Sequence, residues 1–165
     1  MVTFSTGGIQ RRESPLLAVI TIALAVGILD GLAAIIHAFI RSGVKPEMIF
    51  RYIASALLGK EAYSGGGGVV MLGVFLHFLI ALIWSAVFFV AYPRLRLLQG
   101  NKWLVGFGYG IFVWLIMTFV VLELTGMLQL PLDPLAAAIG ILIHMFVVGL
   151  PISTMTQRWF NAKFP

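Results

Sequence analysis

The chain has 165 residues, of which 61% are hydrophobic and 10% are charged. A soluble domain carries about 25% charged residues, so a soluble globular domain is excluded, and so is a disordered chain. Cysteine is absent, which excludes disulfides, thiol catalysis and zinc–thiolate sites. The net charge of +5 does not indicate a nucleic-acid partner, because the Lys and Arg residues lie between apolar stretches, as they do beside membrane spans.

Four apolar stretches each reach the length of about 20 residues that a transmembrane helix needs. They cover residues 16–40, 69–92, 103–122 and 135–156. Strands of a β-barrel would be about half as long and would alternate polar with apolar residues. The sequence therefore predicts an all-α membrane protein whose residues 1–165 form one domain with four transmembrane helices.

Prolines and capping side chains predict where these helices begin and end. Ser14 and Asp133 each precede a proline, the arrangement of an N-cap followed by Pro at the first helical position, at the starts of the first and fourth spans. Pro93 closes the second span, since it cannot donate a backbone hydrogen bond. Pro151 lies inside the fourth span and predicts a kink there rather than an end.

A fifth, shorter helix is predicted over residues 46–59, between the first two spans. Pro46 starts it and Gly59 ends it. Its apolar face comprises Ile49, Phe50, Ile53, Leu57 and Leu58. We expect an external amphipathic helix that lies on the outer leaflet; a lid packed on the rim of the bundle is the alternative.

The basic residues predict the orientation in the membrane. Seven lie on the side of the termini: Arg11, Arg12, Arg94, Arg96, Lys102, Arg158 and Lys163. Four lie on the other side: Arg41, Lys45, Arg51 and Lys60. Both termini are therefore expected in the cytoplasm. Arg11 and Arg12 before a long apolar run indicate an uncleaved signal anchor.

The two halves of the chain share a pattern of glycines. Spans one and three carry Gly27-x-x-x-Gly31 and Gly106-x-x-x-Gly110, and spans two and four carry Gly73-x-x-x-His77 and Gly140-x-x-x-His144. Two tandem hairpins of the same orientation would produce this repeat. Glycines at this spacing let helices approach closely, so these six residues are predicted to pack helices together.

Four polar residues interrupt the apolar spans: Asp30, His37, His77 and His144. Helical rise of about 1.5 Å per residue places Asp30, His77 and His144 at a similar depth, with His37 about two turns nearer the outer boundary. An intramembrane carboxylate is costly unless it is protonated or paired. This candidate cluster is not expected to bind a metal ion, since His37 is too shallow to join the others.

Three interpretations of this cluster stay open. The histidines can bond to backbone carbonyls or to Asp30 and fix the register of the helices. They can relay protons or ions together with Asp30. As a third alternative, His77 and His144 can be the axial ligands of haem b, since they lie on different spans at equal depth. No nucleophile elbow or phosphate-binding loop is present, so no catalytic residues are predicted.

Several segments resemble a widespread, uncharacterised bacterial family of small four-span membrane proteins. They are FRYIASALLG at 50–59, LHFLIA at 76–81, GYG at 108–110, GILIHM at 140–145 and VGLPI at 148–152. The similarity covers most of residues 20–155 and extends more distantly to YagU-like inner-membrane proteins; the chain departs from it at Glu123. The resemblance implies a bacterial inner-membrane location and four spans, and no particular activity.

The functional expectation is a non-enzymatic membrane protein with no cofactor. It would be an envelope protein or an accessory subunit that associates laterally within the lipid bilayer with a larger complex or with itself. A proton or ion transporter that uses Asp30 and the histidine pair is the first alternative. A bis-histidine haem-b electron-transfer protein is the second.

Overall fold

The computed structural model describes residues 14–163, and these residues form helices joined by short connections, with no β-strand among them. Arg11 and Arg12, on which the signal anchor was predicted, lie outside the described residues. The first and second apolar stretches form α1 (Pro15–Ser42) and α3 (Gly67–Ala91). Both are long and apolar enough to cross a membrane, as predicted.

The third and fourth spans are each built from three successive helical pieces. The third comprises α4 (Lys102–Ile116), a π-helical segment (Met117–Val121) and α5 (Leu122–Leu124). The fourth comprises α6 (Pro134–Ile143), a π-helical segment (His144–Gly149) and α7 (Leu150–Lys163). Each of these composite helices is also long and apolar enough to span a membrane. The chain is thus an all-helical membrane protein with four candidate spans in its described part.

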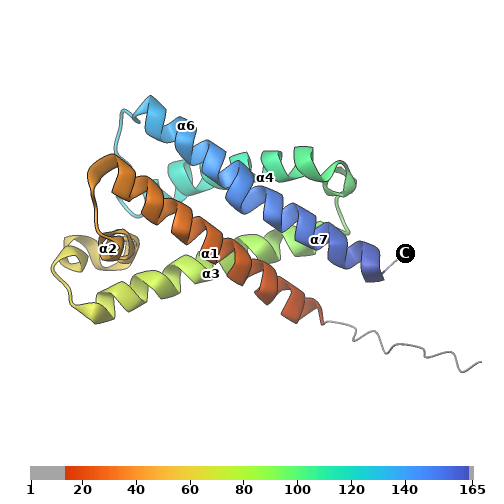
Figure 1. Ribbon diagram of the computed structural model, residues 1–165, viewed down its shortest axis with the longest axis horizontal. Helices are drawn as coiled ribbons and strands as arrows, with labels where there is room; N and C mark the ends of the chain where they lie inside the picture. The colour runs from red at the N-terminus through yellow and green to blue at the C-terminus, as the bar shows by residue number, and fades with distance from the viewer. Residues whose placement is uncertain (1–13, 164–165) are drawn as a thin grey trace, which may run out of the picture.

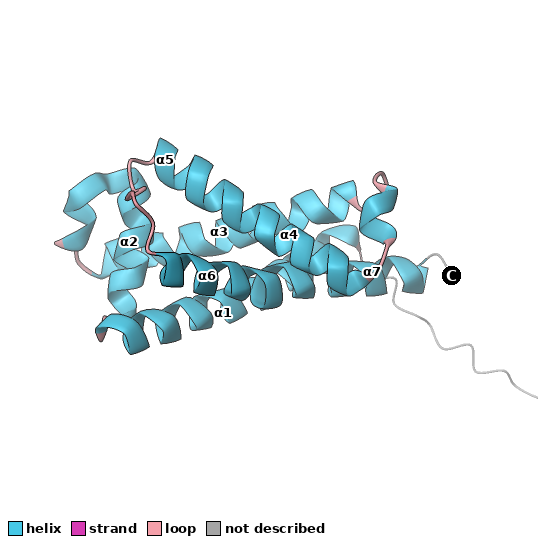
Figure 2. Cartoon of the chain, turned by 90° about the horizontal axis from the view of Figure 1, so that it is seen from above, coloured by secondary structure: helices cyan, strands magenta, loops and turns pink. Residues whose placement is uncertain are grey.

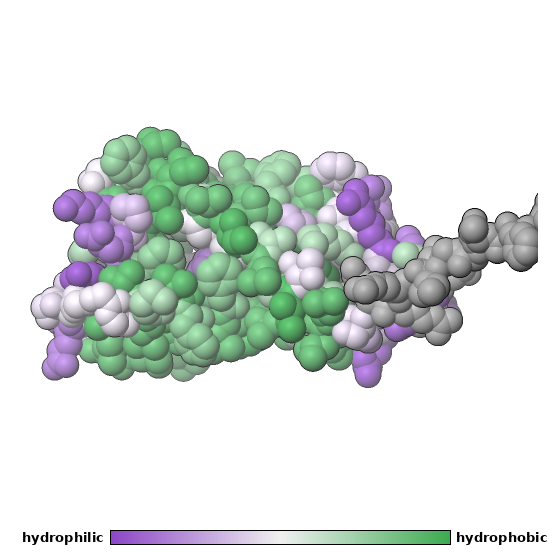
Figure 3. Space-filling view, turned by 60° about the horizontal axis from the view of Figure 1, so that its bottom comes forward, coloured by the Kyte–Doolittle hydropathy of each residue, from purple (hydrophilic) through white to green (hydrophobic). Residues whose placement is uncertain are grey.

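The four spans run alongside one another, with the start of α1 and the end of α7 at the same end of the molecule (Figures 1 and 2). We call this the terminal end. The opposite end carries α2 (Pro46–Leu58), a 3-10 helix (Gly59–Tyr63) and the connection between α5 and α6. Hydrophilic side chains gather at both ends, and a hydrophobic band lies between them (Figure 3). This distribution suits a protein whose middle is covered by lipid.

The predicted caps are present. The Ser14 hydroxyl accepts a hydrogen bond from the backbone N–H of Leu17 at 3.2 Å, and the Asp133 carboxylate accepts one from Ala136 at 3.0 Å. Helix α3 ends at Ala91, just before Pro93. These boundaries were predictable because capping is a local property of sequence.

The fourth span continues through Pro151, as predicted, and reaches Lys163 rather than ending near residue 156. The irregularity beside Pro151 is the π-helical segment, in which the N–H of Leu150 bonds to the carbonyl of Met145. Proline has no N–H to donate, so the helix beside it readily changes its hydrogen-bond register. The third span contains a similar π-helical segment without any proline, and nothing in the sequence pattern predicted it.

The packed core of the bundle lies in the half nearest the terminal end. Its centre is formed by Phe88 and Ile152, which are fully buried, with Val26 and Val113 beside them. The ring of Phe88 meets the ring of Tyr109 edge-on, with centroids 4.7 Å apart. Within the described residues, two buried hydroxyls in the bundle, those of Ser85 and Thr156, have no hydrogen-bond partner.

Glycines bring the spans together. Added Cβ atoms at Gly27 and Gly31 would meet Phe78 at 2.7 Å and His77 at 3.2 Å, both on α3. Cβ atoms at Gly106 and Gly110 would overlap the backbone of the fourth span, at Leu150 and at His144 and Met145. Gly140 lies in the same way against Trp114. All these glycines therefore sit at close helix contacts, and at Gly106 and Gly110, where the neighbour is backbone, a side chain has no room.

Candidate functional site

A cavity of about 310 Å³ lies beyond the packed core, toward the end that carries α2. All four spans and α2 contribute to its walls. The lining residues include Asp30, Gly31 and Ala34 from α1, Ile49, Phe50, Tyr52 and Ile53 from α2, His77 and Trp84 from α3, Trp114 and Met117 from the third span, and His144 from the fourth. Three of the four predicted polar residues thus share one cavity.

Asp30 faces the cavity because of the helical periodicity around it. Gly27, Asp30, Gly31 and Ala34 recur at helical spacing, so small residues and the carboxylate share the face of α1 that packs into the bundle. Asp30 is half-buried and makes no hydrogen bond or ion pair with any residue that the structure describes. A carboxylate at this depth without a partner is energetically costly when ionised, which marks it as a candidate binding group.

His77 joins α3 to α1. Its Nε2 lies 2.8 Å from the carbonyl oxygen of Gly27, and since a carbonyl only accepts, Nε2 carries the proton. The ring lies over Gly31 and meets Phe50 and Phe78 edge-on, with centroids 6.3 and 5.5 Å away. In the neutral ring the second nitrogen, Nδ1, is then an acceptor.

His144 bonds within its own helix. Its Nδ1 lies 2.8 Å from the carbonyl oxygen of Gly140, one turn earlier, so Nδ1 is the donor and Nε2 is the acceptor of the neutral ring. This residue is also the first of the π-helical segment, a kind of irregularity that occurs frequently at functional sites. Each histidine therefore keeps one ring nitrogen that is not used by its carbonyl.

His37 does not share this arrangement. It is half-buried on α1 but is not among the cavity's lining residues, in keeping with its shallower predicted depth. Among the described residues, no three His, Asp or Glu side chains lie together in a way that could hold a metal ion. The structure thus places Asp30, His77 and His144 on the walls of one cavity and leaves His37 outside it.

Helix α2 closes one side of the cavity. Ile49, Phe50 and Ile53, from the apolar face predicted for this helix, line the cavity, while Leu57 and Leu58 are exposed. Gly73 of α3 makes this possible, because a Cβ atom there would overlap the backbone of Phe50. Gly73 therefore packs against α2 rather than against another span.

The aromatic lining was missed by sequence reasoning. Trp84 and Trp114 line the cavity, and the indole N–H of Trp84 donates to the sulfur of Met117 at 3.4 Å. In an apolar span, tryptophan and methionine look the same whether they face lipid, core or cavity. The cavity therefore combines one carboxylate and two imidazoles with aromatic walls.

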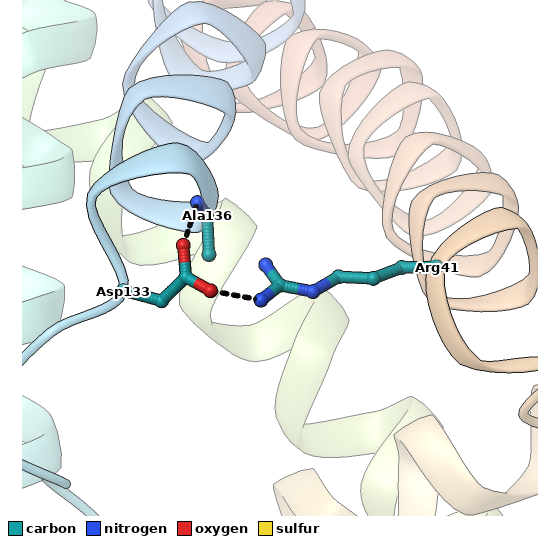
Figure 4. Close-up of polar contacts among 3 residues, drawn as sticks. All are labelled: Arg41, Asp133 and Ala136. Carbon is teal, nitrogen blue, oxygen red and sulfur yellow. Dashed lines mark hydrogen bonds and ion pairs between the residues drawn. The ribbon is translucent and has the colours of Figure 1, made fainter.

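An ion pair between Arg41 and Asp133 ties the end of α1 to the start of α6 (Figure 4). The backbone N–H of Ala136 and the guanidinium of Arg41 both hydrogen-bond to the carboxylate, and together they lower the pKa of Asp133 below its ordinary value of 3.8. The side chains of Arg41 and Asp133 are 40% and 49% exposed, so salt screens the attraction between them. It fastens two spans at the end where the cavity lies.

We expect Asp133→Asn to remove the pH-dependent stabilisation that the ion pair with Arg41 provides. Asparagine can still cap the start of α6, but it carries no charge. A lowered pKa means that the stabilisation is fully present above the ordinary value and is lost as pH falls through the folded-state value. Thermal unfolding measured from about pH 6 down to about pH 3 should therefore show a difference between wild type and variant that shrinks on acidification. A difference that grows on acidification would contradict this assignment.

The fold and the cavity define a class: a four-helix membrane protein with a mainly apolar, aromatic-walled cavity between its spans that holds one carboxyl group and two imidazoles. Comparisons with family models, with curated proteins and with solved structures found no match. The resemblance to the four-span bacterial family therefore stays a prediction, and the cavity is the feature of the structure that bears on function.

Proposed function

We propose that this chain is a non-enzymatic proton transporter of the bacterial inner membrane, with Asp30, His77 and His144 as its proton-binding groups. The observation that carries the proposal is that these three side chains, from three different spans, line one cavity. Ionisable residues inside membrane spans mark ion pathways and proton relays by default.

The chemistry of the three groups supports proton transfer. A carboxylate without a protein partner can take up and release a proton. Each imidazole donates one N–H to a carbonyl and keeps a second nitrogen that can accept a proton. A path from this cavity toward the terminal end has to pass the packed core around Phe88 and Ile152, so transport requires that core to open.

We also propose that the four spans form two tandem hairpins, that both termini are cytoplasmic and that α2 is external. Helix α1 lies against α3, and α4 lies against the fourth span, so two tandem hairpins account for the repeated glycine and histidine pattern. The excess of Lys and Arg at the terminal end supports cytoplasmic termini. In this orientation α2 lies on the external side, partly as a lid on the bundle.

The other two predicted functions gain less support. Apolar side chains exposed along the spans pack as well against lipid as against the partner of an accessory subunit, so they do not favour that role. A haem-ligand role would engage His77 through Nδ1, or would require its bond from Nε2 to Gly27 to break.

The test is proton flux into liposomes that contain the purified full-length protein and an internal pH-sensitive dye. Under an imposed membrane potential, wild type should carry protons faster than empty liposomes. Asp30→Asn should lower the protein-dependent rate at least about tenfold, because asparagine cannot bind a transferable proton.

The matched control is Glu47→Gln, which removes an exposed carboxylate from α2, outside the spans. Its flux should equal that of wild type. Wild-type flux no greater than that of empty liposomes, or equal flux in wild type and Asp30→Asn, would overturn the proposal.

A further inference from the structure

The cavity is larger than a proton relay requires. At about 310 Å³ it falls within the range of small-molecule binding sites, roughly 300–1,000 Å³. About 10–15 Å³ of such space is enough to hold one water molecule, so a few relay waters would leave most of the cavity unused. The volume points to a solute in addition to the proton.

The walls select the chemical class of that solute. They hold a single carboxylate, that of Asp30, whereas Ca²⁺ takes six to eight oxygen ligands and Mg²⁺ six. The rest is mainly aliphatic and aromatic, including Phe50, Trp84 and Trp114. A carboxylate beside aromatic rings is the combination that binds organic ammonium ions, through charge pairing and cation–π attraction.

The remaining polar groups are compatible with a cation. The other titratable side chains on the walls are His77, His144 and Tyr52. Each imidazole bonds to a backbone carbonyl through one nitrogen and leaves the other nitrogen for a ligand. Desolvation by burial raises the pKa of Tyr52, which keeps its hydroxyl protonated. Tyr52 lines the cavity and is also 39% exposed, so this wall of the cavity reaches the surface beside α2.

We propose that the cavity binds an organic ammonium cation carrying an apolar group, and that this cation and a proton exchange at Asp30. The inference rests on the proposed function, since it names the solute whose binding competes with the transported proton. The only bond that breaks and re-forms is the O–H bond of the Asp30 carboxyl group. The protonated carboxyl group releases its proton to solvent when the cation binds, and the carboxylate takes up a proton again when the cation leaves.

The experiment compares two probes of nearly the same shape on the purified full-length protein. Phenyltrimethylammonium carries the positive charge, and tert-butylbenzene has a carbon atom in place of the charged nitrogen. Binding is followed by tryptophan fluorescence, because Trp84 and Trp114 line the cavity. On wild type, the cation should bind saturably and at least about tenfold more tightly than the neutral probe.

Asp30→Asn should weaken cation binding at least about tenfold and leave binding of the neutral probe unchanged, which also shows that the cavity is still formed. Glu47→Gln should bind both probes as wild type does. Equal affinity of wild type for the two probes, or absence of saturable cation binding, would overturn the inference even if Asp30→Asn did not fold. Proton flux without cation binding would overturn the inference alone, whereas cation binding without proton flux would overturn the proposed function.

Discussion

Replacing Gly149 with alanine should push the third and fourth spans apart and destabilise the protein. Gly149 is buried where an added Cβ atom would overlap the carbonyl of Gly106 and the backbone of Gly110. Backbone atoms cannot rotate away as a side chain can, so the two helices must separate. We expect a loss of about 3 kcal/mol in the free energy of unfolding, at the upper end of overpacking effects.

The matched control is Gly108→Ala, on the same helix as Gly106 and Gly110. An added Cβ atom at Gly108 meets nothing within 4 Å. Alanine is about 1 kcal/mol more favourable than glycine in a helix interior, so this variant should be as stable as wild type or more stable. Denaturing-detergent titrations of the three proteins measure the difference. A Gly149→Ala protein as stable as Gly108→Ala would show that these helices do not meet as described.

Replacing Phe88 with alanine should cost about 2 kcal/mol of unfolding free energy. Phe88 is fully buried at the centre of the core and packs edge-on against Tyr109. In a soluble protein such a change costs about 3–5 kcal/mol. In a bilayer the unfolded helix still buries the ring in lipid, so only the lost packing contributes.

Phe75→Ala provides the comparison, because Phe75 lies on the same helix but is 62% exposed on the outside of the bundle. Its removal should leave the unfolding free energy nearly unchanged. Both variants can be followed in the same detergent titration as the glycine variants. Equal losses of unfolding free energy in Phe75→Ala and Phe88→Ala would mean that the bundle has no packed core in the half nearest the terminal end.

The helices themselves were predictable, because their signals are local. A run of about 20 apolar residues specifies a span, and Ser14, Pro15, Asp133 and Pro134 mark helix starts by their own hydrogen-bonding capacity. The inward face of α1 also followed from helical periodicity, which placed Asp30 among small residues. The rise per residue of a helix also predicted that Asp30, His77 and His144 lie at a similar depth, and in the structure they line one cavity.

The cavity was not predictable, since it depends on contacts between distant segments. Helix α2 reaches its position because Gly73 leaves room for the backbone of Phe50, although the pattern around Gly73 only indicated close packing. The pair of Arg41 and Asp133 joins residues 92 positions apart. Gly149 was not singled out because its partners, Gly106 and Gly110, lie on another span.

The central claim, a cavity inside the bundle that attracts cations through the carboxyl group of Asp30, is most directly tested by thiol accessibility. The chain has no cysteine, so Ala34→Cys and Ile36→Cys each carry a single thiol. Ala34 lines the cavity, while Ile36 is 57% exposed on the outer surface of the same helix, where lipid would cover it. Only a thiol that water reaches forms the reactive thiolate.

The measurement is the rate at which a cationic and an anionic methanethiosulfonate of similar size modify these variants in membranes. We predict that both reagents modify Ala34→Cys and that neither modifies Ile36→Cys. At Ala34→Cys the cationic reagent should react about fivefold faster than the anionic one, or more, and the additional substitution Asp30→Asn should remove this preference. Equal reactivity at both positions, or a cation preference that survives Asp30→Asn, would contradict the account.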